Sequence, residues 1–109
     1  MKKIVLLIAL VFSLPAFSQG VSGGGVIVHL GSINEILLFR VSGNTESNRP
    51  ACAITKRFAV HKDSVHAPLI MMAFANGKKL GSLRGFGTCS QHSNAEDLRW
   101  FEICPVTGC

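Results

Sequence analysis

Residues 63–77 read DSVHAPLIMMAFANG, and they predict a single helix in a chain otherwise built from strands. A polar residue at the start can cap the helix, and Pro68 falls in the first turn, where a missing N–H is tolerated. Gly77 suits the left-handed position that follows a helix C-terminus. We therefore expect a helix from Ser64 to Asn76 that is apolar over more than half of its circumference.

Strands are predicted on both sides of this helix, because apolar residues alternate there with a period of two. The expected strands are Val26–Leu30, Ile36–Val41, Ala51–Val60, Lys79–Cys89 and Leu98–Ile103, with a turn at Gly31-Ser32. Glycines and turn-forming residues predict a flexible lead-in over Gly20–Gly25 and an exposed loop over Ser42–Pro50. This order predicts a mainly β fold with one helix, a small OB-like, partly open β-barrel stapled by disulfides.

The first eighteen residues have the layout of a secretory signal peptide. Lys2 and Lys3 provide the positive end, Ile4–Phe12 the apolar core, and Ala16–Ser18 the small residues before the cleavage point. The apolar run is too short to span a bilayer permanently. We expect residues 1–18 to be removed, residues 19–109 to form one small domain, and the protein to be periplasmic or secreted with no membrane span.

All four cysteines lie in the predicted mature part, and they are Cys52, Cys89, Cys104 and Cys109. An even count in a small exported protein predicts two disulfides, which would help to stabilise a domain of about ninety residues. Four cysteines allow three pairings. The turn-forming residues between the last two favour Cys104 with Cys109, which leaves Cys52 with Cys89.

Charge and motifs argue against several classes of function. Without the two leader lysines, nine Lys and Arg stand against six Asp and Glu, and the basic residues are scattered along the sequence, so no nucleic-acid ligand is expected. The histidine spacings predict no metal, and no phosphate-binding or nucleophile motif is present. Glu96 and Asp97 would point to opposite faces of a strand, so we interpret them as solvated turn charges. We predict a protein that is not an enzyme and holds no cofactor.

Trp100 is the candidate ligand-binding residue. Its neighbours Phe101 and Ile103 make the better core face, which leaves the indole pointing outward. An exposed tryptophan commonly marks a contact surface for a sugar ring or a partner protein. The alternative is that Trp100 packs beneath the helix.

Four segments resemble a family of small exported proteins from gammaproteobacteria, most of them uncharacterised. The segments are Ala51–Val60, Asn76–Leu80, Gly85–Cys89 and Glu96–Leu98, and the match spans roughly the last sixty residues. This family is similar, more distantly, to the B subunit of subtilase cytotoxin, whose OB-fold chains form a pentamer that binds sialylated glycans. The resemblance implies an OB-like barrel and pairing of Cys52 with Cys89. It carries over no glycan-contact residue, because the first strands do not match.

We therefore expect a secreted or periplasmic, non-enzymatic binding module that is glycan-binding, toxin-B-subunit-like and homo-oligomeric. The alternative is an envelope protein that binds another protein, such as an enzyme inhibitor. In that case the predicted loop Ser42–Pro50 and Trp100 would form the contact surface.

Overall fold

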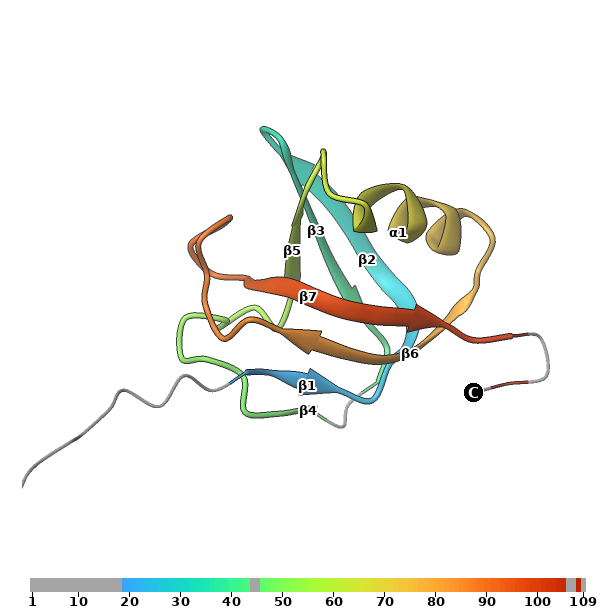
Figure 1. Ribbon diagram of the computed structural model, residues 1–109, viewed down its shortest axis with the longest axis horizontal. Helices are drawn as coiled ribbons and strands as arrows, with labels where there is room; N and C mark the ends of the chain where they lie inside the picture. The colour runs from blue at the N-terminus through green and yellow to red at the C-terminus, as the bar shows by residue number, and fades with distance from the viewer. Residues whose placement is uncertain (1–18, 44–45, 106–107, 109) are drawn as a thin grey trace, which may run out of the picture.

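The computed structural model describes residues 19–43, 46–105 and 108 (Figure 1). Within them the chain is mainly β with one helix, as predicted. The elements are β1 (Val21–Ser22), β2 (Gly25–Ile33), β3 (Ile36–Val41), β4 (Glu46–Ser47), β5 (Phe58–His61), α1 (His66–Ala75), β6 (Lys79–Gly85) and β7 (Glu96–Ile103). The predicted signal peptide lies outside the described residues. None of the described helical structure is long and apolar enough to cross a membrane.

The strands form one sheet that is partly closed on itself. Its order is β2-β3-β5-β7-β6-β1-β4, and β2 also pairs with β6. Five strands therefore surround a common core in a partly closed sheet, which agrees with the predicted mainly β, partly open architecture. β5 and β7 are parallel and pair only through Phe58–Glu96 and Ala59–Asp97. Beyond these pairs the two strands run in different directions, which leaves the sheet open between them (Figure 1).

The hydrophobic core fills the inside of this ring. Phe39 and Phe58 are fully buried, with their ring centroids 5.8 Å apart. α1 packs against β2 and β5 and contributes Ala67, Ile70 and Ala73, all of them fully buried. Each large apolar side chain buried in this way stabilises the fold by roughly 1.5–3 kcal/mol.

The ends of α1 confirm most of the helix prediction. The helix runs from His66 to Ala75, inside the predicted limits, and the Ser64 hydroxyl accepts a hydrogen bond from the His66 N–H at 3.1 Å. Gly77 has a φ of +60°, and its N–H donates to the Phe74 carbonyl. The next N–H, from residue 78, reaches back to the carbonyl of residue 73. These two bonds form a Schellman motif, which satisfies the last carbonyls of the helix.

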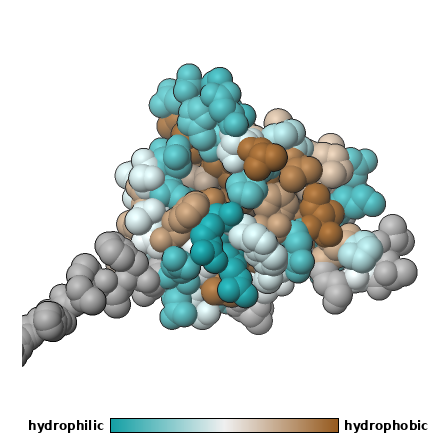
Figure 2. Space-filling view, viewed as in Figure 1, coloured by the Kyte–Doolittle hydropathy of each residue, from teal (hydrophilic) through white to brown (hydrophobic). Residues whose placement is uncertain are grey.

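The outer side of α1 is unusually hydrophobic for a surface helix. No charged residue occurs between His66 and Ala75. Its half-exposed apolar side chains are Leu69, Met71, Met72 and Phe74. Figure 2 shows hydrophobic side chains gathered on the side of the molecule where α1 lies.

The first hairpin differs from prediction only in its turn. β3 has the predicted bounds, Ile36–Val41, but β2 continues through Gly31-Ser32, which was expected to turn. The reversal comes at Asn34, whose φ of +54° is tolerated better by asparagine than by most residues. Ile33 pairs directly with Ile36 across this turn.

Residues 51–57 do not form the predicted strand. Their backbone groups are satisfied within successive turns, because the Ala53 N–H donates to the Pro50 carbonyl and the Lys56 N–H donates to the Ala53 carbonyl. Lys56 also has a φ of +60°, which is incompatible with an extended strand. Of the residues predicted to form this strand, only those from Phe58 onward are extended, and they form β5.

The predicted flexible lead-in is wrong as well. Val21–Ser22 forms β1, which pairs with both β4 and β6, and Gly20 and Gly24 are buried. A methyl group on Gly20 would collide with the Glu96 carboxylate. Glycine is needed here because the chain passes close to its neighbours.

The disulfide prediction is confirmed where the structure can test it. Cys52 and Cys89 are bonded, with a Cα–Cα distance of 6.3 Å, and they join the 51–57 turns to the loop that follows β6. β6 ends at Gly85, earlier than the predicted Cys89, so Phe86 and the residues after it belong to that loop. The predicted Cys104–Cys109 bond involves Cys109, which lies outside the described residues.

Candidate functional site

Two consecutive carboxylates are buried at the start of β7. Glu96 is 0% exposed and Asp97 is 6% exposed, so their interpretation as solvated turn charges is wrong. As consecutive strand residues they point to opposite sides, as expected. Each carboxylate organises a different set of backbone and side-chain donors.

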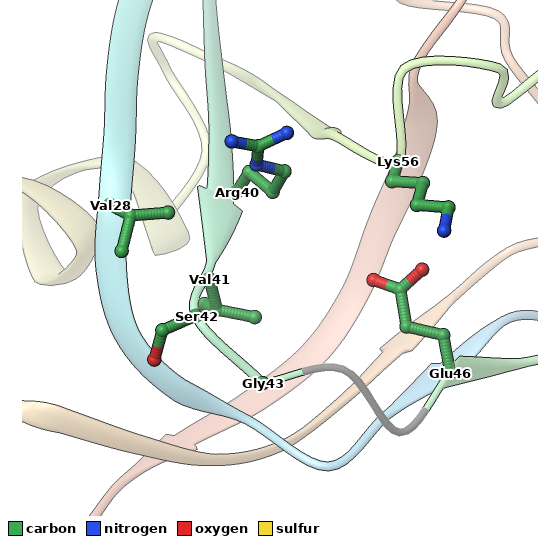
Figure 3. Close-up of a pocket in the computed structure, with 7 residues that line it drawn as sticks. All are labelled: Val28, Arg40, Val41, Ser42, Gly43, Glu46 and Lys56. Atoms are coloured by element: carbon green, nitrogen blue, oxygen red, sulfur yellow. The ribbon is translucent and has the colours of Figure 1, made fainter.

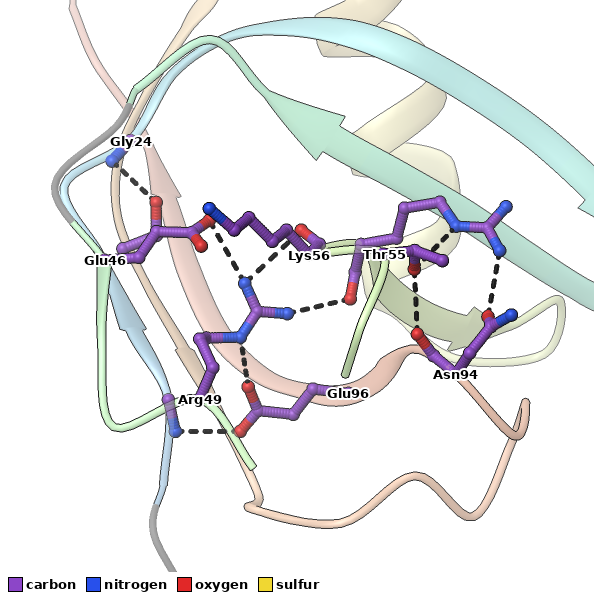
Figure 4. Close-up of polar contacts among 10 residues, drawn as sticks. Gly24, Glu46, Arg49, Thr55, Lys56, Asn94 and Glu96 are labelled. Carbon is purple, nitrogen blue, oxygen red and sulfur yellow. Dashed lines mark hydrogen bonds and ion pairs between the residues drawn. The ribbon is translucent and has the colours of Figure 1, made fainter. Parts of the chain in front are cut away.

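Glu96 lies at the centre of a network that joins three distant segments (Figure 4). One oxygen accepts hydrogen bonds from the Gly20 N–H at 2.8 Å and the Gly87 N–H at 2.9 Å. The other oxygen accepts from Arg49 Nε at 2.7 Å. Charge-assisted bonds of this kind are stronger than neutral ones. Glu96 therefore fixes the N-terminal segment, the turn that carries Arg49, and the loop after β6.

Arg49 extends this network towards β5. Its guanidinium contacts Glu46 at 3.1 Å and donates to the carbonyls of Lys56 and Arg57. It also lies over the Phe58 ring, 4.1 Å from the centroid. The Arg49 side chain is only 10% exposed, so the prediction that Ser42–Pro50 is an exposed loop is wrong for this part.

Asp97 holds the loop after β6 through side-chain and backbone donors. Its carboxylate accepts hydrogen bonds from the Thr88 hydroxyl at 2.6 Å, the Ser90 hydroxyl at 2.6 Å and the Gln91 N–H at 2.9 Å. Burial by itself raises the pKa of Asp97, but the bonds from Ser90, Thr88 and Gln91 together outweigh it, so the pKa is lowered. The carboxylate stays ionised and acts as an anchor for residues 88–91.

This lowered pKa predicts a specific dependence of stability on pH. Because the folded protein holds the ionised Asp97 better than the unfolded chain does, its contribution is present above the unfolded pKa of about 3.9 and is lost as pH falls through the folded value. In thermal unfolding between pH 6 and pH 2, wild type should be more stable than Asp97→Asn at the upper end, and the gap should close towards the lower end. A gap that stays constant over this range would contradict the assignment.

A pocket opens beside Asp97, where the parallel pairing of β5 and β7 ends. It has a volume of about 460 Å³, within the range of small-molecule sites. The residues that line it are Ala59, Val60, His61, Ser64, Phe86, Thr88, Ser90, Gln91, Asp97 and Leu98. We call it the Phe86 pocket, because the Phe86 ring is its exposed aromatic side chain, 50% accessible. The Phe86 N–H donates to the Asp97 carbonyl at 2.9 Å, which fixes the backbone beneath the ring.

The chemistry of the Phe86 pocket suits a ligand that carries hydroxyl groups. Thr88 and Ser90 direct their hydroxyl protons to Asp97, so each oxygen keeps lone pairs that can accept from a ligand. Gln91 adds an amide that can both donate and accept. Sequence analysis missed Phe86, although a large apolar residue between two glycines, just after a strand rich in glycine, was a usable signal.

A second candidate region lies on the outer side of β2 and β3. Arg40 separates two shallow hollows of about 310 Å³ and 200 Å³ and lines both of them. The basic side chains beside these hollows are His29, Arg40, Lys56 and Arg57, and together we call them the Arg40 surface. Figure 3 shows Arg40 and Lys56 at the larger hollow, which Glu46 also lines. Basic residues that are scattered in the sequence are thus brought together by the fold.

Trp100 is exposed, as predicted, and lies apart from both regions. It is 42% accessible and pairs across the ladder with Arg84, whose guanidinium is 5.7 Å from the indole centroid. An irregularity in the pairing at Arg99 turns both Leu98 and Phe101 towards the core, so strict alternation along β7 fails at Leu98. Trp100 lines neither the Phe86 pocket nor the hollows of the Arg40 surface.

Comparisons with known proteins add no further constraint. Within the described residues, no group of three His, Cys, Asp or Glu side chains is placed to hold a metal ion. No protein-family model, curated protein or solved structure matches this chain.

Proposed function

We propose that this protein is an exported, non-enzymatic module that binds a saccharide in the Phe86 pocket. The observation that carries the proposal is an exposed aromatic ring beside two hydroxyls whose protons are held by a buried carboxylate. Saccharides combine apolar C–H faces, which pack on aromatic rings, with hydroxyl groups that donate to such oxygens. The disulfide between Cys52 and Cys89 supports an oxidising compartment such as the periplasm or the extracellular space.

The arrangement favours binding over acid–base chemistry. Asp97 is the carboxylate that lines the Phe86 pocket, and both of its oxygens already accept hydrogen bonds from the protein. Its lowered pKa makes it a poor proton donor near neutral pH. Asp97 therefore serves to position the hydroxyls that face a ligand.

A paired substitution tests this function. Phe86→Ala should weaken binding of any saccharide identified on a glycan array by about tenfold, because truncating a central aromatic contact typically costs more than 1 kcal/mol. Trp100→Ala is the matched control, since Trp100 is similarly exposed, 42% against 50%, but lies on β7 outside the pocket. Affinities would be measured by calorimetry.

Two results would overturn the saccharide assignment. One is a blank array with correctly folded wild-type protein. The other is equal binding by the Phe86 and Trp100 variants to the saccharide that the array identifies.

The outer side of α1 favours self-association as a second property. A helix that is apolar on all sides is usually covered, and α1 exposes Leu69, Met72 and Phe74 by 41–47%. We propose that a second copy of this chain covers it in a homo-oligomer. Light scattering should then give a mass above that of the monomer, and Leu69→Glu should lower it. A monomeric wild type would reject self-association and leave the saccharide proposal to its own test.

A further inference from the structure

The Arg40 surface carries positive charge that the protein does not neutralise. Among the described residues, the side chains of Arg40 and Lys56 make no hydrogen bond or ion pair. Arg57 donates to the Thr55 hydroxyl at 3.0 Å and to the Asn94 side-chain oxygen at 2.9 Å, which are both neutral acceptors. Guanidinium groups without a carboxylate partner are free to bind an oxyanion.

Nearby carboxylates leave this charge in excess. Glu46 lines one of the hollows, but it is paired with Arg49, which also neutralises the buried Glu96. Four cations, Arg40, Arg49, Lys56 and Arg57, thus stand against two carboxylates, which leaves a local charge of +2. His29 lies directly opposite Arg40 in the β2–β3 ladder and adds a further polar donor.

A strand and a hydrogen-bonded turn hold these groups in place. Arg40 is on β3, next to Phe39, which pairs with Phe58 at the start of β5. The backbone carbonyls of Lys56 and Arg57 are held by Arg49. Figure 3 shows Arg40 extending from β3 towards the side on which Lys56 lies, with the Lys56 ammonium pointing towards Glu46. The charges therefore lie around two neighbouring hollows that share Arg40.

We propose that the Arg40 surface is an anion-binding site, distinct from the Phe86 pocket, that takes the sulfate or carboxylate groups of an acidic polysaccharide. Nucleic acid is the competing polyanion, but proteins that bind single strands place aromatic rings under the bases. The two hollows contain no Phe or Trp. Their aliphatic and hydroxyl lining, such as Val28 and Ser42, suits a sugar backbone between the charged groups.

The site is tested by charge reversal at Arg40. Wild-type protein should bind heparin, used as a sulfated polysaccharide probe, and Arg40→Glu should weaken that binding by at least about tenfold, as expected when a charge-assisted contact becomes repulsive. Arg99→Glu is the matched control, because Arg99 is exposed on β7 and lines neither hollow. When both are measured at the same ionic strength, the control and wild type should differ in heparin affinity by less than about twofold.

Further variants and a second ligand distinguish this site from the Phe86 pocket and from binding by net charge alone. Arg40→Gln should give an intermediate loss, and Phe86→Ala should leave heparin binding unchanged, which distinguishes this site from the Phe86 pocket. Equal losses for Arg40→Glu and Arg99→Glu would show that binding follows net charge, and would overturn the proposal. Absence of heparin binding by wild type would also overturn it, as would equal affinity for single-stranded DNA of matched charge.

Discussion

Glu96→Gln is expected to destabilise the protein by about 3 kcal/mol or more, in line with other broken buried ion pairs. Glutamine has almost the same shape, so the loss reports on charge and hydrogen bonding. One Glu96 oxygen accepts from Arg49, and the other accepts from the N–H groups of Gly20 and Gly87. Whichever way the amide is oriented, its NH₂ group must face donors. The side chain is fully buried, so water cannot relieve this conflict.

Urea unfolding measures this effect, and the same strand provides a control. Glu102→Gln removes a carboxylate from an exposed position of β7 and should change stability by no more than about 0.5 kcal/mol. Arg49→Gln and the double variant complete a cycle in which the two losses should be clearly less than additive. If Glu96→Gln were as mild as Glu102→Gln, the buried network would not hold the segments together.

The same substitution should also weaken ligand binding in the Phe86 pocket. Gly87 follows Phe86, and its N–H is fixed by Glu96. Without that bond the loop after β6 loses one of its anchors, and only Asp97 and the Cys52–Cys89 disulfide among those described above still hold it. The network thus connects stability of the core with the geometry of the proposed site.

The parts of the fold that sequence predicted are those determined by neighbouring residues. β3 is apolar except for Arg40, and its bounds, Ile36–Val41, are as expected. α1 ends where Gly77 allows a left-handed turn. These features depend on the periodicity of apolar side chains and on local backbone preference, and both can be read from neighbouring residues in the sequence.

The parts that sequence missed depend on contacts between distant segments. Whether Glu96 is buried is decided by Gly20, Arg49 and Gly87, which are separated from it by up to 76 positions. The turns at residues 51–57 resemble a strand in sequence, because Ala51–Ile54 is a run of small or apolar residues that leads towards the apolar residues of β5. The local sequence pattern alone could therefore reveal neither the burial of Glu96 nor the turns at residues 51–57.

The candidate sites likewise combine features set by neighbouring residues with features set by contacts between distant segments. Of the two placements that the sequence left open for Trp100, the structure shows the exposed one, on β7 and outside both hollows. Arg40 and Arg57 are seventeen positions apart in sequence, and antiparallel pairing of β3 with β5 brings their neighbours Phe39 and Phe58 into register. A basic surface can therefore arise from charges that look scattered along the chain.

Removal of the Cys52–Cys89 disulfide is expected to cost about 4 kcal/mol, the value of the chain-entropy model for a loop of this length. The two cysteines are 37 positions apart, so the crosslink greatly restricts the unfolded chain. A loss of this size is a large fraction of the total stability of a small domain, which is about 5–15 kcal/mol.

The bond should also matter locally, because it joins the two segments that carry the proposed sites. Cys52 belongs to the turns that end in Lys56 and Arg57, and Cys89 belongs to the loop that carries Phe86 and Thr88. A double variant with serine at both positions, compared with wild type in urea, measures the cost without leaving a free thiol. Adding dithiothreitol to the double variant then shows the contribution of any other crosslink. Since the bond tethers both segments, heparin affinity and saccharide affinity should fall together, and a variant within about 1 kcal/mol of wild type would contradict this role for the disulfide.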